Sequence, residues 1–290
     1  MEAAGLRGFV ISISILLLFS VILSFVLFLY HENARAEAKL ARAHSIPSPA
    51  YFFDDVATDL SSLLSHNITA LRDNTTLRIR IQGSFANPPS AANFTAYSSL
   101  LSSGYSNLTN SNLSLDAAGL ADGTGEAAFS NGLLFSYAYT GASKSAFLSS
   151  SANDTGASAY EINVSVDRNR QSYNPWSSSP GGDLNVTLRI MDRSGNLTSI
   201  VSLNRSAVNA YTVAYQGGSL IIRAGKIGAA NGALEVNPSG NIVDYTYYTS
   251  VASLPPGNLS ASMRYYWNAW LNYSRPGNVS RSDWVEIGRA

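Results

Sequence analysis

Thirteen asparagine side chains in this sequence lie in the acceptor pattern for N-linked glycosylation. In Asn-X-Ser/Thr, where X is not proline, the asparagine amide accepts a glycan. Chance would give about five such patterns at this composition, given the acceptor rule. We therefore expect a heavily glycosylated surface domain; the alternative is that strands and turns rich in serine, threonine and asparagine produce the pattern without modification. The acceptor candidates are Asn67, Asn74, Asn93, Asn107, Asn112, Asn153, Asn163, Asn185, Asn196, Asn204, Asn258, Asn272 and Asn278.

Aromatic rings are the second kind of side chain that suggests binding. The alternation over residues 265–273 predicts a strand in which Tyr266 and Trp270 share the outward face with Asn272. Tyr173 and Trp176 lie in a predicted loop. Aromatic faces combine apolar area with a polar handle, so these four rings would form a ligand surface that stacks on sugars or a partner protein. In the alternative interpretation, N-terminal helices cover this sheet and the rings belong to the core.

The residue types needed for catalysis are few and scattered. The three histidines, His31, His44 and His66, fall in the predicted N-terminal helices and none falls in the predicted β region. The sequence has no cysteine. This distribution argues against a Ser-His-Asp triad, thiol chemistry and metal sites built from histidine or thiolate. We predict a protein that is not an enzyme and has no cofactor or metal site.

Carboxylates leave one catalytic alternative open, a surface hydrolase. Asp122 and Glu126 lie on a glycine-rich stretch, but it lacks the spacing of a calcium loop, so we interpret it as a plain loop. Glycoside hydrolysis requires two carboxylates held across a cleft. The sequence does not place any two of its later acids opposite each other; they are Glu161, Glu235, Asp244 and Glu286.

An uncharged apolar run at residues 9–30 would position all these groups at a membrane. As a helix it is about 33 Å long, enough to cross the hydrocarbon core of a bilayer, so we predict a single transmembrane helix. Basic residues are sparse before the run and denser after it, which by the positive-inside rule would place the C-terminal part inside. We give the sequons more weight, because long domains translocate largely regardless of such charges. The prediction is an extracellular C-terminal domain.

The junction before this run resembles a known processing signal. Arg7 and Gly8, directly before Phe9, resemble the basic residue and glycine of class III signal peptides in archaeal type IV pilin-like proteins. The resemblance covers residues 1 to about 45 and implies cleavage between Gly8 and Phe9 by a prepilin peptidase. In that family the apolar helix holds subunits in the membrane and can pack into a filament core, so self-association is implied. Ile13 departs from the family, because many pilins carry glutamate at this fifth mature position.

The remaining elements are predicted from periodicity. After a leader (1–8) and the span (9–30), helical spacing predicts a stalk and an amphipathic helix over 31–75. Residues 76–150 read as a small α+β region, with strands near 77–81, 112–116, 132–139 and 145–149 and a short helix near 94–101. Alternating strands with frequent turn signals over 151–290 predict an antiparallel β-sandwich.

Composition narrows the partners. Only 13% of the 290 residues are charged and the net charge is zero, which argues against a nucleic-acid partner. We predict a mainly β fold with N-terminal α structure, in a membrane-anchored, N-glycosylated cell-surface protein with a structural or adhesive role. Its expected partners are membrane lipid, other copies of the chain, and a glycan or surface protein. A tethered carbohydrate-binding module is the alternative.

Overall fold

The chain forms two compact units, Met1–Phe52 and Phe53–Ala290, and each is described by itself. The computed structural model describes residues 23–24, 48–64, 66–72, 76–85, 91–109, 111–140, 143–176, 182–240, 243–252, 264–275 and 279–289. Within the first unit the described residues are 23–24 and 48–52, and all of them are helical.

The predicted leader, the junction at Arg7, Gly8 and Phe9, and the stalk over 31–45 lie outside the described residues. So does the predicted span, apart from Leu23 and Ser24. Within the described part of the chain, no helix has the length and apolar character to cross a membrane.

Helix α2 (Ser48–Leu63) is the predicted amphipathic helix. From Phe53 onward it buries Val56 and Leu60, and it exposes its aspartates, among them Asp55 and Asp59. The predicted short helix near 94–101 is also confirmed, as α3 (Ala91–Ser99), a π-helical segment η1 (Leu100–Tyr105) and α4 (Ser106–Thr109). Another short helix is α5 (Ala118–Ala121).

The first sheet has six strands in the order β1-β2-β14-β7-β9-β10. In most of its strands, apolar residues that face the core alternate with polar residues that face outward. In β2, for example, Leu77, Ile79 and Ile81 are buried between exposed residues. The strands are β1 (His66–Arg72), β2 (Thr76–Ser84), β7 (Ala157–Val166), β9 (Leu184–Asp192), β10 (Gly195–Leu203) and β14 (Val243–Ala252).

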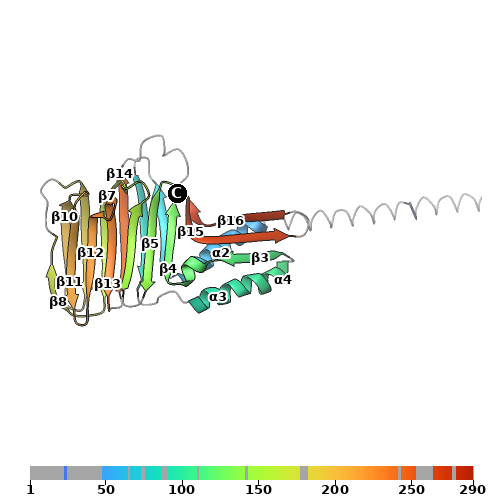
Figure 1. Ribbon diagram of the computed structural model, residues 1–290, viewed down its shortest axis with the longest axis horizontal. Coiled ribbons are helices and arrows are strands. Elements are labelled where there is room, and N and C mark those ends of the chain that lie inside the picture. Colours follow the sequence, from blue (N-terminus) through green and yellow to red (C-terminus); the bar gives the residue numbers. More distant parts are fainter. Residues whose placement is uncertain are drawn as a thin grey trace, which may run out of the picture. The chain divides into compact units, whose positions relative to one another are not determined.

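The second sheet has ten strands, in the order β16-β15-β4-β5-β6-β13-β12-β11-β8 with β3 paired to β15 (Figure 1). Strand β15 is shared along its length: Tyr265–Trp267 pair with β4, and Trp270–Ser274 pair with β3. The strands are β3 (Asn112–Asp116), β4 (Thr124–Phe129), β5 (Leu133–Thr140), β6 (Ser143–Ser150), β8 (Arg170–Asn174), β11 (Val208–Tyr215), β12 (Gly218–Ile227), β13 (Ala230–Ser239), β15 (Arg264–Arg275) and β16 (Val279–Arg289).

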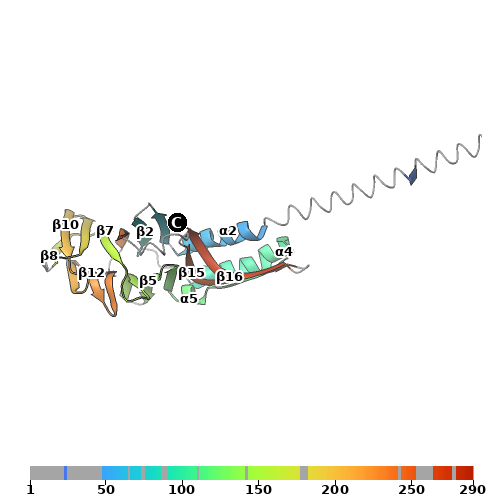
Figure 2. The same ribbon diagram turned by 90° about the horizontal axis from the view of Figure 1, so that it is seen from above.

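The two sheets pack face to face, and Figure 2 shows them as two layers. Hydrogen bonds and ring contacts cross between the layers. The Tyr139 hydroxyl donates to the Ser84 carbonyl at 2.7 Å, and the Tyr160 hydroxyl donates to the Gly232 carbonyl. The prediction of a mainly β protein with a sandwich-like arrangement is therefore confirmed.

Three expectations are corrected. The sheets are not antiparallel throughout, because β7 pairs with β9 in parallel. His66 does not lie in a helix: α2 ends three residues before it, at Leu63, and His66 begins β1 and is 2% exposed. The stretch from Asp122 is not a plain loop, since Thr124 begins β4.

Strands from residues 76–150 and from 151–290 share both sheets. In the ten-stranded sheet, β4, β5 and β6 stand between β15 and β13. In the six-stranded sheet, β2 is bonded to β14, which is bonded to β7. The two ranges therefore contribute to one hydrophobic core.

Candidate functional site

The sequon asparagines lie on the surface of the second unit wherever their side chains are described. Ten of the thirteen can be placed, since Asn74, Asn258 and Asn278 lie outside the described residues. Asn163 is half-buried and the other nine are exposed; they are Asn67, Asn93, Asn107, Asn112, Asn153, Asn185, Asn196, Asn204 and Asn272. A glycan cannot enter a packed core, so this placement satisfies the first steric requirement of modification.

Asparagines outside sequons are distributed differently. Seven have described side chains, and of these only Asn169 and Asn174 are exposed. Asn209 is the extreme case: it is 2% exposed, and its amide nitrogen donates at 3.0 Å to the carbonyls of Asn204, Ala207 and Ala224. Asparagines in sequons are therefore exposed more often than other asparagines of this chain, among those with described side chains.

The sequon asparagines on strands point away from the core because the residues on either side of them point into it. Asn163 in β7 is flanked by Ile162 and Val164, which are buried, and Asn185 in β9 is flanked by Leu184 and Val186, which are buried. The strand period of two sends the asparagine to the opposite face. The predicted polar faces of these two strands are confirmed.

The Asn153 sequon has a different local structure. Asn153 adopts a left-handed backbone with φ of 60° and is exposed, whereas Thr155 is only 4% exposed. The Thr155 hydroxyl donates to the Gly232 carbonyl at 2.6 Å and accepts from the Ala157 amide at 3.2 Å. In the folded chain, the hydroxyl of this sequon thus belongs to the core.

The four aromatic residues proposed as a ligand surface do not come together. Tyr173 lies on β8 at one edge of the ten-stranded sheet, whereas Tyr266 and Trp270 lie on β15, seven strands away. At the usual strand spacing this separation is roughly 34 Å. Trp176 packs against Tyr211 at 5.5 Å between ring centroids and is only 7% exposed, so it presents no face to a ligand. The combined surface is corrected to two separate features.

The feature on β15 is an aromatic pair, of which the sequence analysis identified Trp270 but not its partner. Trp270 contacts Trp284 of β16 edge to face, with 5.1 Å between ring centroids, and Trp284 is 50% exposed. The two residues are directly paired across the strands. Tyr266, Trp270 and Asn272 occupy the outward positions of β15, as predicted, between buried residues. The strand partner of Trp270 could not be predicted from local sequence.

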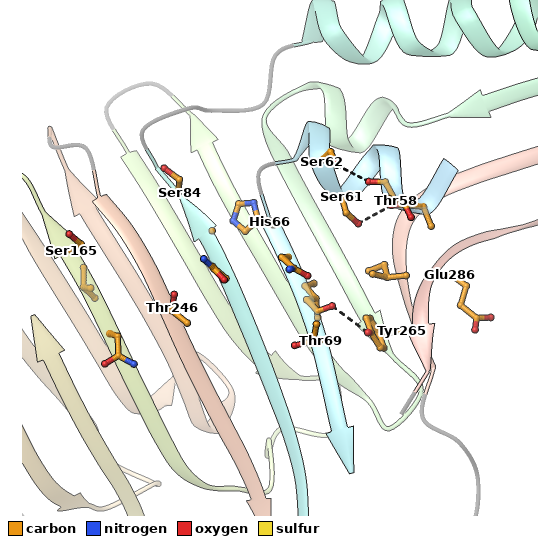
Figure 3. A pocket seen from close by; sticks show the side chains of 18 of the residues that line it. Thr58, Ser61, Ser62, His66, Thr69, Ser84, Ser165, Thr246, Tyr265 and Glu286 are labelled. Carbon is orange, nitrogen blue, oxygen red and sulfur yellow. Dashed lines mark hydrogen bonds between the residues drawn. The ribbon is translucent and has the colours of Figure 1, made fainter. Parts of the chain in front are cut away.

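A polar groove of about 940 Å³ lies on the outer face of the six-stranded sheet. Its floor is a row of four side chains in register across four strands: Asn67, Gln82, Thr246 and Asn163. Figure 3 shows Ser165 and Thr246 on neighbouring strands of this floor, with the α2 hydroxyls and Glu286 at the other side. Hydroxyl and amide groups can donate and accept hydrogen bonds, as carbohydrate recognition requires.

His66 lies at the base of this groove but belongs to the core. Its ring stacks on Tyr137 with 4.6 Å between centroids, and its Nδ1 lies 2.7 Å from the Leu64 carbonyl, to which it donates. The imidazole lies over Gly83, where a Cβ would approach its Cδ2 within 2.6 Å. Burial lowers the pKa of His66 to about 4, so the ring is neutral at physiological pH and suits a structural role.

The four later acids of the sequence lie on four different strands, β7, β13, β14 and β16. Glu161 on the six-stranded sheet contacts Arg189 at 2.7 Å, and Glu235 on the ten-stranded sheet contacts Arg223 at 2.7 Å. Glu286 lines the groove. Asp244 lies in β14, opposite Ser165 in the sheet register.

The stretch from Asp122 forms a hydrogen-bonded turn. The Asp122 carboxylate accepts from the Thr124 hydroxyl at 2.7 Å and from the Thr124 amide at 3.1 Å. These bonds lower the pKa of Asp122. Within the described part of the chain, no group of three or more histidine or acidic side chains is arranged to hold a metal ion.

Comparisons with known proteins add no family to this description. No family model matches the chain, and neither the curated proteins nor the solved structures give a significant match.

Proposed function

We propose that this chain is a membrane-anchored, N-glycosylated cell-surface protein with a structural or adhesive role. The apolar run at 9–30 would be the single transmembrane helix, followed by a helical stalk, and the β-sandwich would lie outside the cell. The junction at Arg7, Gly8 and Phe9 supports processing as a pilin-like subunit. The observation that carries the proposal is the surface position of the sequon asparagines, nine of ten exposed among those described.

Mass spectrometry of the protein purified from its native membrane tests this proposal. The expected mature chain begins at Phe9 and carries glycans on exposed sequon asparagines such as Asn185 and Asn272. Asn169 and Asn174, which are exposed but lie outside sequons, serve as internal controls and should be unmodified. A chain that retains Met1 and has bare asparagines throughout would contradict both the processing and the orientation.

Protease added outside intact cells gives an independent test of orientation. The second unit should be digested or released in intact cells, because the proposal places it outside. Protection of this unit, with digestion only after lysis, would place it inside the cell. The orientation would then be the one that the positive-inside rule predicts from the basic residues after the apolar run.

A second candidate function, a tethered carbohydrate-binding module, is favoured by the polar groove rather than by the four aromatic residues. Binding of the full chain to a glycan array, lost on Gln82→Ala and Thr246→Ala, would support it. Asn67 and Asn163 lie on the same groove floor. Their glycans would occupy the groove, so ligand binding should be stronger in protein made without glycosylation. Equal binding by the groove variants and the unaltered chain would exclude the groove as the site.

A further inference from the structure

The outward face formed by β3, β15 and β16 brings an acceptor asparagine beside the pair of half-buried Trp270 and exposed Trp284. In the sheet register, Trp270 of β15 lies between Asp116 of β3 and Trp284 of β16. Two residues further along β15, Asn272 lies between Ser114 and Ser282. Trp270 and Asn272 are two residues apart on one strand, so both side chains project from the same face. The asparagine and the two indoles are therefore immediate neighbours.

Two hydrogen bonds fix the orientation of the Asn272 amide. The Trp270 Nε1–H donates to Asn272 Oδ1 at 3.0 Å, and Asn272 Nδ2 donates to the Ser114 hydroxyl at 3.3 Å. An indole nitrogen is only a donor, so the atom that it meets must be the amide oxygen. The oxygen end of the amide is thus held against Trp270.

Amide chemistry then decides where an attached sugar would emerge. Glycosylation converts the side chain to a secondary amide, which prefers the planar trans arrangement of its two carbon substituents. The anomeric carbon of the sugar is then trans to Cβ, on the same side of the C–N bond as Oδ1. Because Trp270 binds Oδ1, the first sugar leaves the amide beside the indole. One N–H remains on Nδ2, trans to Oδ1.

We infer that the first sugar of a glycan on Asn272 packs against the Trp270–Trp284 pair. The inference rests on the proposed glycosylation and adds a binding role for these two indoles. Half of the Trp284 surface is exposed, and the C–H face of a pyranose offers the apolar surface that an indole face needs. A sugar tethered two residues away has a far higher effective concentration than a free ligand, so it would occupy the pair first.

The other sequons lack the tryptophan on which this arrangement depends. Asn272 alone among the thirteen has a tryptophan two positions earlier. Asn107 follows Tyr105 by two residues, but Asn107 lies in α4, where side chains two residues apart point in different directions. Asn204 follows Ser202 by two residues and is exposed. Its sequon therefore serves as the control, an exposed acceptor site without an aromatic residue two positions earlier.

A double-mutant cycle on the full glycosylated chain tests the inference. Ser274→Ala removes the Asn272 acceptor signal while leaving Asn272 and Trp270 intact, and Ser274 is exposed. The expected result is a thermal midpoint lowered by about 2–4 °C, the scale of one aromatic contact in a domain of this size. In the Trp270→Ala background, Ser274→Ala should have no effect. The control Ser206→Ala, which removes the Asn204 signal, should act equally in both backgrounds.

Two further measurements separate the failure of this inference from failure of glycosylation. Glycopeptide mass spectrometry first establishes occupancy at Asn272; a bare Asn272 beside other occupied sites overturns the inference but not the proposed function. With Asn272 occupied, Ser274→Ala should increase acrylamide quenching of tryptophan fluorescence. Equal quenching together with equal effects in both backgrounds would show that the glycan does not contact the pair.

Discussion

At the scale of single residues, His66 makes the stability of the domain depend on pH. The buried ring has a pKa of about 4, below the value of 6.5 expected in the unfolded chain. As the pH falls, His66 of the unfolded state binds a proton before His66 of the folded state does, so the free energy of unfolding decreases. The contribution of neutral His66 is complete above about pH 6.5 and is lost progressively towards pH 4.

We predict that the free energy of unfolding falls by up to about 3 kcal/mol over this interval because of His66, since each pKa unit corresponds to about 1.4 kcal/mol. Denaturant unfolding at a series of pH values measures the slope. His66→Phe keeps an aromatic ring against Tyr137 but has no titratable group, so its slope should be shallower. Parallel slopes in the two proteins would show that other groups cause the acid sensitivity.

The Asn153 sequon allows glycosylation to be separated from packing. Asn153→Gly keeps the left-handed backbone, because glycine adopts positive φ without cost, so the variant should fold with nearly unchanged stability. Thr155→Val also removes the sequon but deletes the hydroxyl that bonds to Gly232 and Ala157. It should cost about 1–3 kcal/mol, since the buried Ala157 amide loses this acceptor and the Gly232 carbonyl keeps only the bond from the Tyr160 hydroxyl. Unfolding of both variants in unglycosylated protein provides the comparison; equal stabilities would refute the structural role of Thr155.

At the scale of elements, strands with strict alternation were predictable and the others were not. The burial of Leu77, Ile79 and Ile81 in β2 followed directly from the pattern. Strand β13 (Ala230–Ser239) carries no clear strand signal, because its glycine, asparagine and proline are residues typical of turns. Strand β4 was missed for a similar reason: Gly125 suggested a loop, whereas the structure uses it for clearance, since a Cβ there would meet the Tyr137 ring at 2.2 Å.

Strand β10 is the edge element with the clearest consequence. It ends the order of the six-stranded sheet, and Ile200 on its outward face is 78% exposed. An exposed edge with apolar side chains favours pairing with another chain, and the Asn196 glycan would shield it. Protein made without glycans should therefore self-associate through β10, and Ile200→Lys should reduce the association.

The matched control for this edge is Met191→Lys. Met191 is 54% exposed on the same face, but β9 is paired on both sides. Sedimentation of the two variants measures the difference. An equal decrease in association for both would indicate a general effect of charge and not edge pairing.

At the scale of the whole molecule, local sequence could not reveal the order of the strands. Strand β14 enters between β2 and β7, and β4–β6 enter between β15 and β13, so the pairing joins segments far apart in the chain. The groove depends on this order, because its floor combines Asn67 with Thr246. Alternation predicts which face a side chain occupies, but not which strand lies beside it.

This interleaving predicts that the strands after residue 150 do not form an independent domain. A fragment of residues 151–290 would lose β4, β5 and β6, so that β13 and β15 become open edges, and it would lose β2 beside β14. Unpaired backbone groups and an uncovered apolar face both disfavour folding. Residues 53–290 should instead unfold in one cooperative transition, measured by circular dichroism and calorimetry. A cooperative transition and dispersed amide resonances from the fragment 151–290 would contradict the single shared core, because they require a sheet that is complete without β4–β6.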